Sequence, residues 1–292
     1  MHAIAGGSGR PTSATRAGLV AALLLICAVS AVAWPAGVQA ASVRYLNPVF
    51  SSVSRDANLQ YGTAVKSDGT RQKLYLDLYR PVGDTKSNRP VVIFVHGGDY
   101  RVPKDVWRNR ILVEMFARRG YVAASMQYRS GVDGTSREAA WDMRAAVRWF
   151  KKNAGSLRVS PNRIVVMGTS AGASAALHVA FNPDDACNSG NPAYSSNVAA
   201  GMSLSGIGDV SEINPGDPPI AMVVAEDDHP FWEGTLATCN ATRAVGNVCD
   251  LHEYSEGGHP PPFFLEYRAQ IIDQFSWFIC KRVLGPTICP SV

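Results

Sequence analysis

The sequence predicts an α/β protein in which a mostly parallel central sheet carries helices on both faces. Short apolar runs of strand length alternate with longer helical stretches, and this alternation continues through most of the chain. Because neighbouring parallel strands need a long crossover connection, usually a helix, the alternation favours a parallel sheet between two helical layers. The 292 residues are 46% hydrophobic and 18% charged, a balance typical of a globular protein with a substantial core.

The hydrophobic pattern places the individual elements. Leucines alternate with polar and aromatic residues over 74–78, as in a half-buried strand, and the apolar run 91–95 is typical of a strand covered on both faces. Thr135, with Glu138 three residues later, forms the capping-box pattern before one of the helices. Further strands are predicted at 121–126, 164–167, 199–204, 220–225 and 251–254. Helices are predicted at 106–119, 137–153, 171–181, 231–245 and 263–283.

The first 40 residues are predicted to be a secretory signal peptide. Arg10 and Arg16 supply positive charge without any acid, an apolar run follows over 19–34, and small residues lead to a cleavage site after Ala40. The apolar run is shorter than the roughly 20 residues that span a bilayer, which argues against an uncleaved anchor. We therefore predict a secreted protein, extracellular or periplasmic, with no stable membrane insertion after cleavage. Residues 41–292 then form one domain, because no linker or repeat divides them.

Charge and motifs exclude several kinds of partner. The formal charge is +4, and loss of the two signal-peptide arginines leaves +2, without any basic run. Nucleic-acid binding favours a concentrated basic stripe, so we expect no nucleic-acid partner. The sequence has no P-loop, dinucleotide fingerprint or H-E-x-x-H motif, and we predict no cofactor and no metal.

Cysteine usage agrees with export. Five of the six cysteines remain after signal cleavage, and none forms a C-x-x-C pair of the kind found in zinc or redox sites. Proximity in sequence suggests the disulfides Cys239–Cys249 and Cys280–Cys289, although sequence alone leaves connectivity open. Cys187 is left over and is expected to be buried and inert.

A candidate nucleophile lies in Gly168-Thr169-Ser170-Ala171-Gly172, between an apolar strand and a helix of small residues. In such a turn the serine adopts a strained conformation, and glycines two residues to either side prevent clashes. The Ser170 hydroxyl then lies beside a helix N-terminus, whose free N–H groups attract an anion. Upstream, His96-Gly97-Gly98 follows the strand 91–95, and glycines there allow the backbone to direct N–H groups toward an oxyanion.

A serine nucleophile needs a base, and His259 is the best placed histidine. It lies in a glycine-containing loop between the last strand and the last helix, from which an imidazole can reach back across the strand ends. His229 is the reserve choice because it directly follows a candidate acid. The other histidines are assigned structural roles. His96 lies in the turn after a predicted strand, His178 inside a predicted helix and His252 inside a predicted strand.

The third residue must orient the imidazole, and Glu226-Asp227-Asp228 follows the strand 220–225. Asp228 is favoured because two residues separate it from Ala225, the last small residue of the strand. Asp227 remains the alternative.

With these motifs the chain resembles the α/β-hydrolase superfamily of carboxylesterase/lipase type, in particular hormone-sensitive-lipase-like and secreted feruloyl-esterase-like esterases. The similarity extends from about Tyr75 to Phe278 and includes the segments 76–81, 141–146 and 160–164. The chain order of serine, acid and histidine is also that of the superfamily.

The resemblance implies hydrolysis of carboxylic esters through an acyl-enzyme. Ser170 would attack, His259 would transfer the proton, and Asp228 would orient His259. The N–H groups of Gly97, Gly98 and Ala171 would form the oxyanion hole.

The chain departs from the family at two points. Asp99 stands where relatives often have a third glycine, which argues against esters of bulky tertiary alcohols, and its carboxylate should point away from the oxyanion or pair with Arg101. Few residues are available for a lid, so we expect it to be small or absent. An open cleft would accept a small-molecule or polymer-linked ester, with pocket walls from the loops 99–106, 183–197 and 207–219.

Two other functions fit the same motifs. An amide or peptide hydrolase would use the same residues, and turnover of a nitrophenyl ester against an anilide separates the two. A secreted non-catalytic binding protein is the second alternative, since fold does not imply activity. Failure of a fluorophosphonate probe to label Ser170 would favour it.

Overall fold

The computed structural model describes residues 43–100, 106–129, 135–183, 185 and 187–289. The predicted signal peptide lies outside these residues. No helix in the described ranges is long and apolar enough to cross a membrane.

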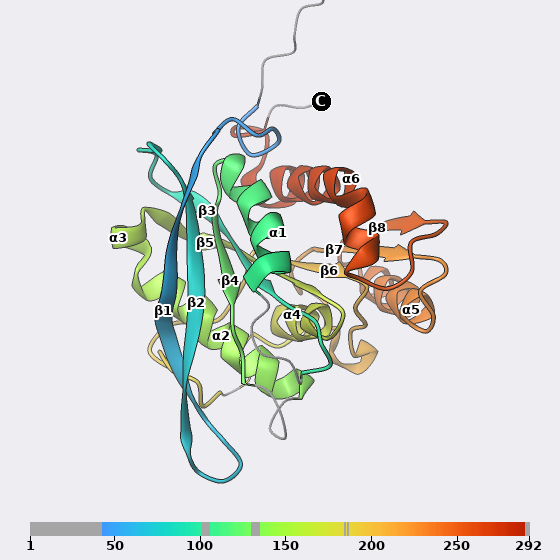
Figure 1. Cartoon of the computed structure of the whole chain (residues 1–292). Coiled ribbons are helices and arrows are strands. Elements are labelled where there is room, and N and C mark those ends of the chain that lie inside the picture. Colours follow the sequence, from blue (N-terminus) through green and yellow to red (C-terminus); the bar gives the residue numbers. More distant parts are fainter. Residues whose placement is uncertain (1–42, 101–105, 130–134, 184, 186, 290–292) are drawn as a thin grey trace, which may run out of the picture. The chain divides into compact units, whose positions relative to one another are not determined.

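The eight strands of the described chain form one sheet in the order β1-β2-β4-β3-β5-β6-β7-β8 (Figure 1). From β4 to β8 every pairing is parallel, whereas β1 and β2 form an antiparallel hairpin and β2 joins β4 in antiparallel orientation. The strands are β1 (Val53–Val65), β2 (Arg71–Pro81), β3 (Arg89–Val95), β4 (Val122–Met126), β5 (Val159–Thr169), β6 (Ala200–Leu204), β7 (Ile220–Ala225) and β8 (Cys249–Tyr254). The predicted mostly parallel sheet is therefore confirmed.

Helices cover both faces of the sheet, as predicted (Figure 1). One face packs on α1 and α6 through strand residues such as Val92 and Phe94, and the other packs on α2 and α4 through Val91 and Ile93. The side of α4 next to β6 and β7 also packs on α5. The helices are α1 (Val106–Arg118), α2 (Ser136–Lys152), α3 (Ala154–Leu157), α4 (Ala171–Phe181), α5 (Phe231–Ala244) and α6 (Pro262–Ile279).

Local signals in the sequence explain several boundaries. Thr135 caps α2 by accepting the Glu138 N–H at 3.3 Å, as the capping-box pattern predicts. The last predicted helix is shorter than expected, because α6 ends at Ile279 and a π-helical turn, Cys280–Leu284, follows it. The edge strand β1 was not predicted. Its exposed and half-buried positions do not alternate regularly, so it carries no clear period-2 pattern.

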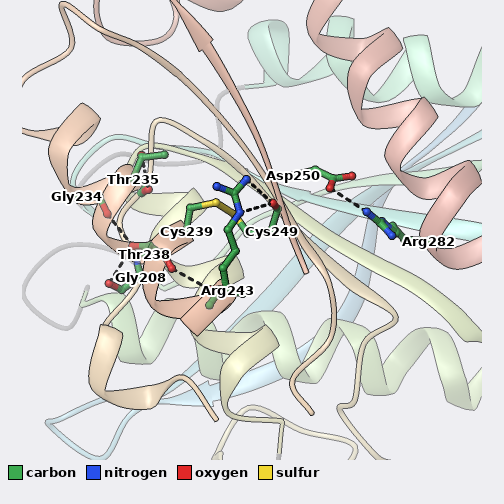
Figure 2. Close-up of a disulfide and its surroundings, with 11 residues drawn as sticks. Gly208, Gly234, Thr235, Thr238, Cys239, Arg243, Cys249, Asp250 and Arg282 are labelled. Atoms are coloured by element: carbon green, nitrogen blue, oxygen red, sulfur yellow. Dashed lines mark hydrogen bonds and ion pairs between the residues drawn. A yellow bond between two sulfur atoms is a disulfide. The ribbon is translucent and has the colours of Figure 1, made fainter. Parts of the chain in front are cut away.

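Both suggested disulfides are present. Cys239 of α5 is bonded to Cys249 of β8, and Cys280 to Cys289, with Cα atoms 5.5 Å apart in each pair. Figure 2 shows the first bridge, where the Arg243 guanidinium also donates to the Cys249 carbonyl oxygen at 2.8 and 3.1 Å. The Cys239–Cys249 bridge and the Arg243 hydrogen bonds together tie α5 to β8, the edge strand that leads into the loop carrying His259.

Cys187 is unpaired, as expected, but it is partly exposed rather than buried. Its Sγ contacts the Arg148 guanidinium at 2.6 Å. The segment that carries it, between α4 and β6, contains no helix or strand among its described residues.

We expect protein without residues 1–40 to show one free thiol, that of Cys187, when it is denatured without reductant. Each bridge closes a loop of 9 or 10 residues, so replacing either pair by alanine should lower the free energy of unfolding by about 2–3 kcal/mol. Thiol titration and denaturant unfolding measure the two effects. Five free thiols would contradict both the pairing and an oxidising compartment.

Candidate active site

The segment around Ser170 joins β5 directly to α4. Ser170 has a φ of 52°, in the left-handed region that non-glycine residues rarely adopt, and this places the strain of the turn at the serine itself. Gly168 and Gly172 are required for a different reason, namely close backbone approach. A Cβ on Gly168 would lie 2.2 Å from the Gly172 carbonyl carbon, and a Cβ on Gly172 would lie 2.5 Å from the His96 carbonyl oxygen.

The structure brings Ser170, His259 and Asp228 together in one line of hydrogen bonds. His259 Nε2 lies 2.7 Å from Ser170 Oγ, and His259 Nδ1 lies 2.9 and 3.0 Å from the two Asp228 oxygens. The Asp228 carboxylate is almost fully buried, with 3% of its side chain exposed, whereas the His259 side chain is 37% exposed. An ionised carboxylate can only accept, so Nδ1 carries the proton and Nε2 is left to accept the Ser170 hydroxyl proton.

These three residues come from the carboxyl ends of parallel strands. Ser170 follows β5, Asp228 follows β7, and His259 follows β8. The carboxyl ends of parallel strands lie at one edge of a sheet, which is why residues 31 and 89 positions apart in sequence meet there.

Asp227 and Asp228 point to different partners. Asp227 is exposed, and its carboxylate accepts the backbone N–H groups of Gly258 at 2.8 Å and Gly257 at 3.3 Å. The Gly258 N–H is the main cause that lowers the pKa of the Asp227 carboxyl. The geometry thus places Asp228, not Asp227, against the imidazole.

The other histidines lie elsewhere. His229, the reserve choice, is exposed and pairs with Glu233 at 2.6 Å. His178 Nδ1 lies 2.5 Å from Glu212, and His252 is half-buried in β8, where burial lowers its pKa. His96 is 3% exposed and stacks on Tyr128, and its Nδ1 lies 2.7 Å from the Gly97 carbonyl oxygen, which fits a brace for the turn.

The loop after β3 departs from the expected oxyanion hole at Gly97. The Gly97 N–H already donates to Thr169 Oγ1 at 3.1 Å, and a Cβ on Gly97 would lie 2.9 Å from the Ser170 Cβ. Among the described residues, by contrast, the N–H groups of Gly98 and Ala171 have no hydrogen-bond acceptor. Of the three N–H groups proposed for the oxyanion hole, that of Gly97 thus already has an acceptor in the structure.

Two aromatic residues near the site were not singled out from the sequence. The Phe231 ring at the start of α5 packs against the His259 imidazole, with ring centroids 4.3 Å apart. The Tyr100 hydroxyl donates to the Ala171 carbonyl oxygen at 2.7 Å, and burial raises the pKa of Tyr100 to about 12. Each lies two or three residues after a motif, Tyr100 after Gly98 and Phe231 after Asp228, which is the only signal that the sequence offers for them. Asp99 is exposed, and its suggested partner Arg101 lies outside the described residues.

An open cavity of about 990 Å³ lies along α4, and Ser170 itself is not among the residues that line it. Its lining includes Ser174, one turn of α4 after Ser170, together with Tyr100, Phe181 and Asp185. Ile207 and its neighbours in the connection between β6 and β7 form another wall. No cluster of His, Cys, Asp and Glu side chains suited to a metal ion occurs among the described residues.

Parts of two curated hydrolases are similar in sequence to this chain. The probable isoprenylcysteine alpha-carbonyl methylesterase ICME of Oryza sativa subsp. japonica is 34% identical over 105 residues, covering 36% of this chain and 25% of that protein. Acylcarnitine hydrolase of Rattus norvegicus is 32% identical over 120 residues, covering 38% of this chain and 21% of that protein. The matched region therefore spans a quarter or less of these relatives.

Among solved structures, an esterase of Thermogutta terrifontis with propionate bound superimposes with a TM-score of 0.67. It is 23% identical, and the match covers 77% of this chain and 94% of that one, which establishes a shared fold. The BD-FAE family model matches residues 76–230, more than half of the 292 residues. The chain therefore belongs to the BD-FAE family, within the α/β-hydrolase superfamily.

Proposed function

We propose that this protein is a secreted serine hydrolase that cleaves carboxylic esters through an acyl-enzyme intermediate. The observation that carries the proposal is the line of hydrogen bonds from Asp228 through His259 to the Ser170 hydroxyl, at 2.7 to 3.0 Å. Relatives whose names describe a methylesterase and an acylcarnitine hydrolase support ester chemistry.

In the first half of the reaction, Ser170 Oγ attacks the ester carbonyl carbon while its proton passes to His259 Nε2. Asp228 stabilises the imidazolium that forms. The tetrahedral intermediate then collapses, the bond to the alcohol oxygen breaks, and His259 returns the proton to the departing alcohol. In the second half, His259 takes a proton from water, whose oxygen attacks the acyl-enzyme, and the carboxylic acid leaves as Ser170 regains its proton.

The oxyanion donors that we propose are the N–H groups of Gly98 and Ala171. Both lack an acceptor among the described residues, and Ala171 is the first residue of α4, where the helix dipole also favours negative charge. Gly97 has a supporting role instead, because its N–H holds the loop to Thr169.

We expect Thr169→Val to lower kcat about tenfold, because the Gly97 N–H loses its acceptor and the Gly98 N–H moves away from the oxyanion. Thr169→Ser retains the hydroxyl and should stay near wild type. Steady-state hydrolysis of a nitrophenyl ester measures both variants. Equal kcat values for Thr169→Val and wild type would show that the hydrogen bond from Gly97 to Thr169 does not position the Gly98 N–H.

The substrate proposed is a small-molecule or polymer-linked ester. The support for this is the open cavity along α4, whose lining includes Ser174, one turn after Ser170, and which could hold a part of the substrate beyond the reacting bond. Secretion is supported by the signal-peptide pattern and by two disulfides, because disulfides persist in oxidising compartments.

Paired substrates with the same acyl group, a nitrophenyl ester and a nitroanilide, test the function directly. We expect turnover of the ester, and covalent labelling of Ser170 by a fluorophosphonate probe. Preferential cleavage of the anilide would assign an amide hydrolase. Absence of both turnover and labelling would assign a non-catalytic binding protein.

A further inference from the structure

We propose that Asp227 is a positioning residue, which holds the loop that carries His259 in its reactive place. The two adjacent acids would then have different roles. Asp228 orients the imidazole ring, and Asp227 holds the backbone that precedes His259. The inference rests on the proposed ester hydrolysis and adds a residue to which the sequence assigned no such role.

The anchor arises from the parallel pairing of β7 and β8. The Glu226 N–H donates to the carbonyl oxygen of Tyr254, the last residue of β8, at 2.8 Å, so pairing continues one residue beyond the end of β7. The turn after β7 therefore lies beside the loop after β8. From that turn Asp227 Oδ1 accepts the Gly258 N–H at 2.8 Å, and Oδ2 accepts the Gly257 N–H at 3.3 Å.

The loop has little else to hold its backbone. In the described part of the chain, no backbone–backbone hydrogen bond joins residues 255–260 to another segment. The Asp227 carboxylate is thus the acceptor that fixes two consecutive amides immediately before His259. A backbone with few hydrogen bonds of its own is expected to open readily when such a contact is lost.

The two glycines make this contact sterically possible. Gly257 has a φ of +145° and Gly258 a φ of +61°, and these conformations direct successive N–H groups to one anion. A Cβ on Gly257 would lie 2.5 Å from the Phe263 ring, so the close approach to α6 also requires glycine. The lowered pKa of Asp227 agrees with an acceptor that is ionised at neutral pH.

Loss of the anchor should affect the chemical step. His259 Nε2 must stay within hydrogen-bond reach of Ser170 Oγ, now 2.7 Å away. Misplacement of a reacting group by about 1 Å can lower a rate about 100-fold. Asp228 orients the ring, but among the described residues it has no hydrogen bond with the backbone of Gly257 or Gly258.

The test compares Asp227→Ala with wild type and with a matched control. We expect Asp227→Ala to lower kcat about 10–100-fold with KM changed less than about twofold, because His259 moves and substrate binding does not. Asp227→Asn keeps one acceptor oxygen, so its kcat should fall less than that of Asp227→Ala. The control is Asp68→Ala in the turn between β1 and β2, where an exposed carboxylate likewise accepts a backbone N–H, that of Thr70 at 2.8 Å. It should leave kcat unchanged.

A second measurement separates positioning from general stability. In a His259→Ala background, the residual hydrolysis no longer uses the imidazole, so adding Asp227→Ala should change it less than about twofold. If Asp227 had a merely structural role, Asp227→Ala would lower the rate of hydrolysis by the same factor in the wild-type and the His259→Ala backgrounds. That result would overturn the proposal. So would a kcat for Asp227→Ala within about twofold of wild type.

Amide hydrogen exchange tests the anchor without any reference to activity. The Gly257 and Gly258 amides should exchange at least about tenfold faster in Asp227→Ala, while amides within β7 and β8 keep their wild-type rates. Unchanged exchange at both glycines would overturn the anchor. If wild type neither hydrolyses esters nor reacts with a fluorophosphonate, the proposed function fails, and the exchange result still decides whether the anchor exists.

Discussion

Ser170→Ala is expected to lower kcat for ester hydrolysis by about 10⁴-fold or more while the protein stays folded. The substitution removes the oxygen that forms the acyl-enzyme in the proposed mechanism, and His259 Nε2, 2.7 Å from that oxygen, then has no hydroxyl proton to take. The oxyanion hole and substrate binding alone retain only residual catalysis. Initial rates with a nitrophenyl ester, with circular dichroism to verify folding, measure the effect.

Ser156→Ala is a suitable control, since this serine in α3 is exposed and its hydroxyl donates to the nearby Asn153 carbonyl oxygen. It should keep wild-type kcat. A Ser170→Ala variant that retains even a tenth of the wild-type activity would remove Ser170 from the mechanism.

The second large effect should separate the two neighbouring acids. Asp228→Asn keeps the shape of the side chain but replaces the carboxylate that accepts from His259 Nδ1, so the ring no longer holds the tautomer that presents Nε2 to Ser170. We expect kcat to fall by about 10³–10⁴-fold with little change in KM. Asp227→Asn should lose less than about tenfold, since its amide oxygen can still accept one glycine N–H.

Both variants are measured with the same ester and compared for thermal stability. If the two losses were reversed, the assignment of Asp228 would be wrong. If neither variant lost activity, the orienting acid would lie elsewhere and the triad would have to be redrawn.

Much of the fold follows from local pattern. Short buried runs such as 91–95 and 220–225 correspond to β3 and β7, because a strand covered on both faces is almost wholly apolar. The strand β1 escaped prediction for the opposite reason. It is an edge strand, half exposed along most of its length, and it derives its order from pairing with β2 rather than from its own composition.

In the candidate site, too, some features could be predicted from local sequence and others could not. Ser170 could be proposed as the nucleophile because a strained strand-to-helix turn requires glycines at fixed positions. His259 could be favoured as the base because of its loop position and its order along the chain, with His229 kept as the reserve choice. Disulfide pairing could be suggested because cysteines close in sequence can also be close in space.

Other features depended on contacts between distant segments. The sequence could favour Asp228 over Asp227 only by spacing, whereas the β7–β8 register brings one acid to the imidazole and the other to the Gly257 and Gly258 amides. Likewise, nothing next to Gly97 in the chain reveals that Thr169, 72 residues away, already accepts its N–H. Sequence by itself determined which residue types stand at each strand end. Tertiary structure decided which atoms they meet, because hydrogen-bond partners are set by the relative placement of strands and turns that no local pattern encodes.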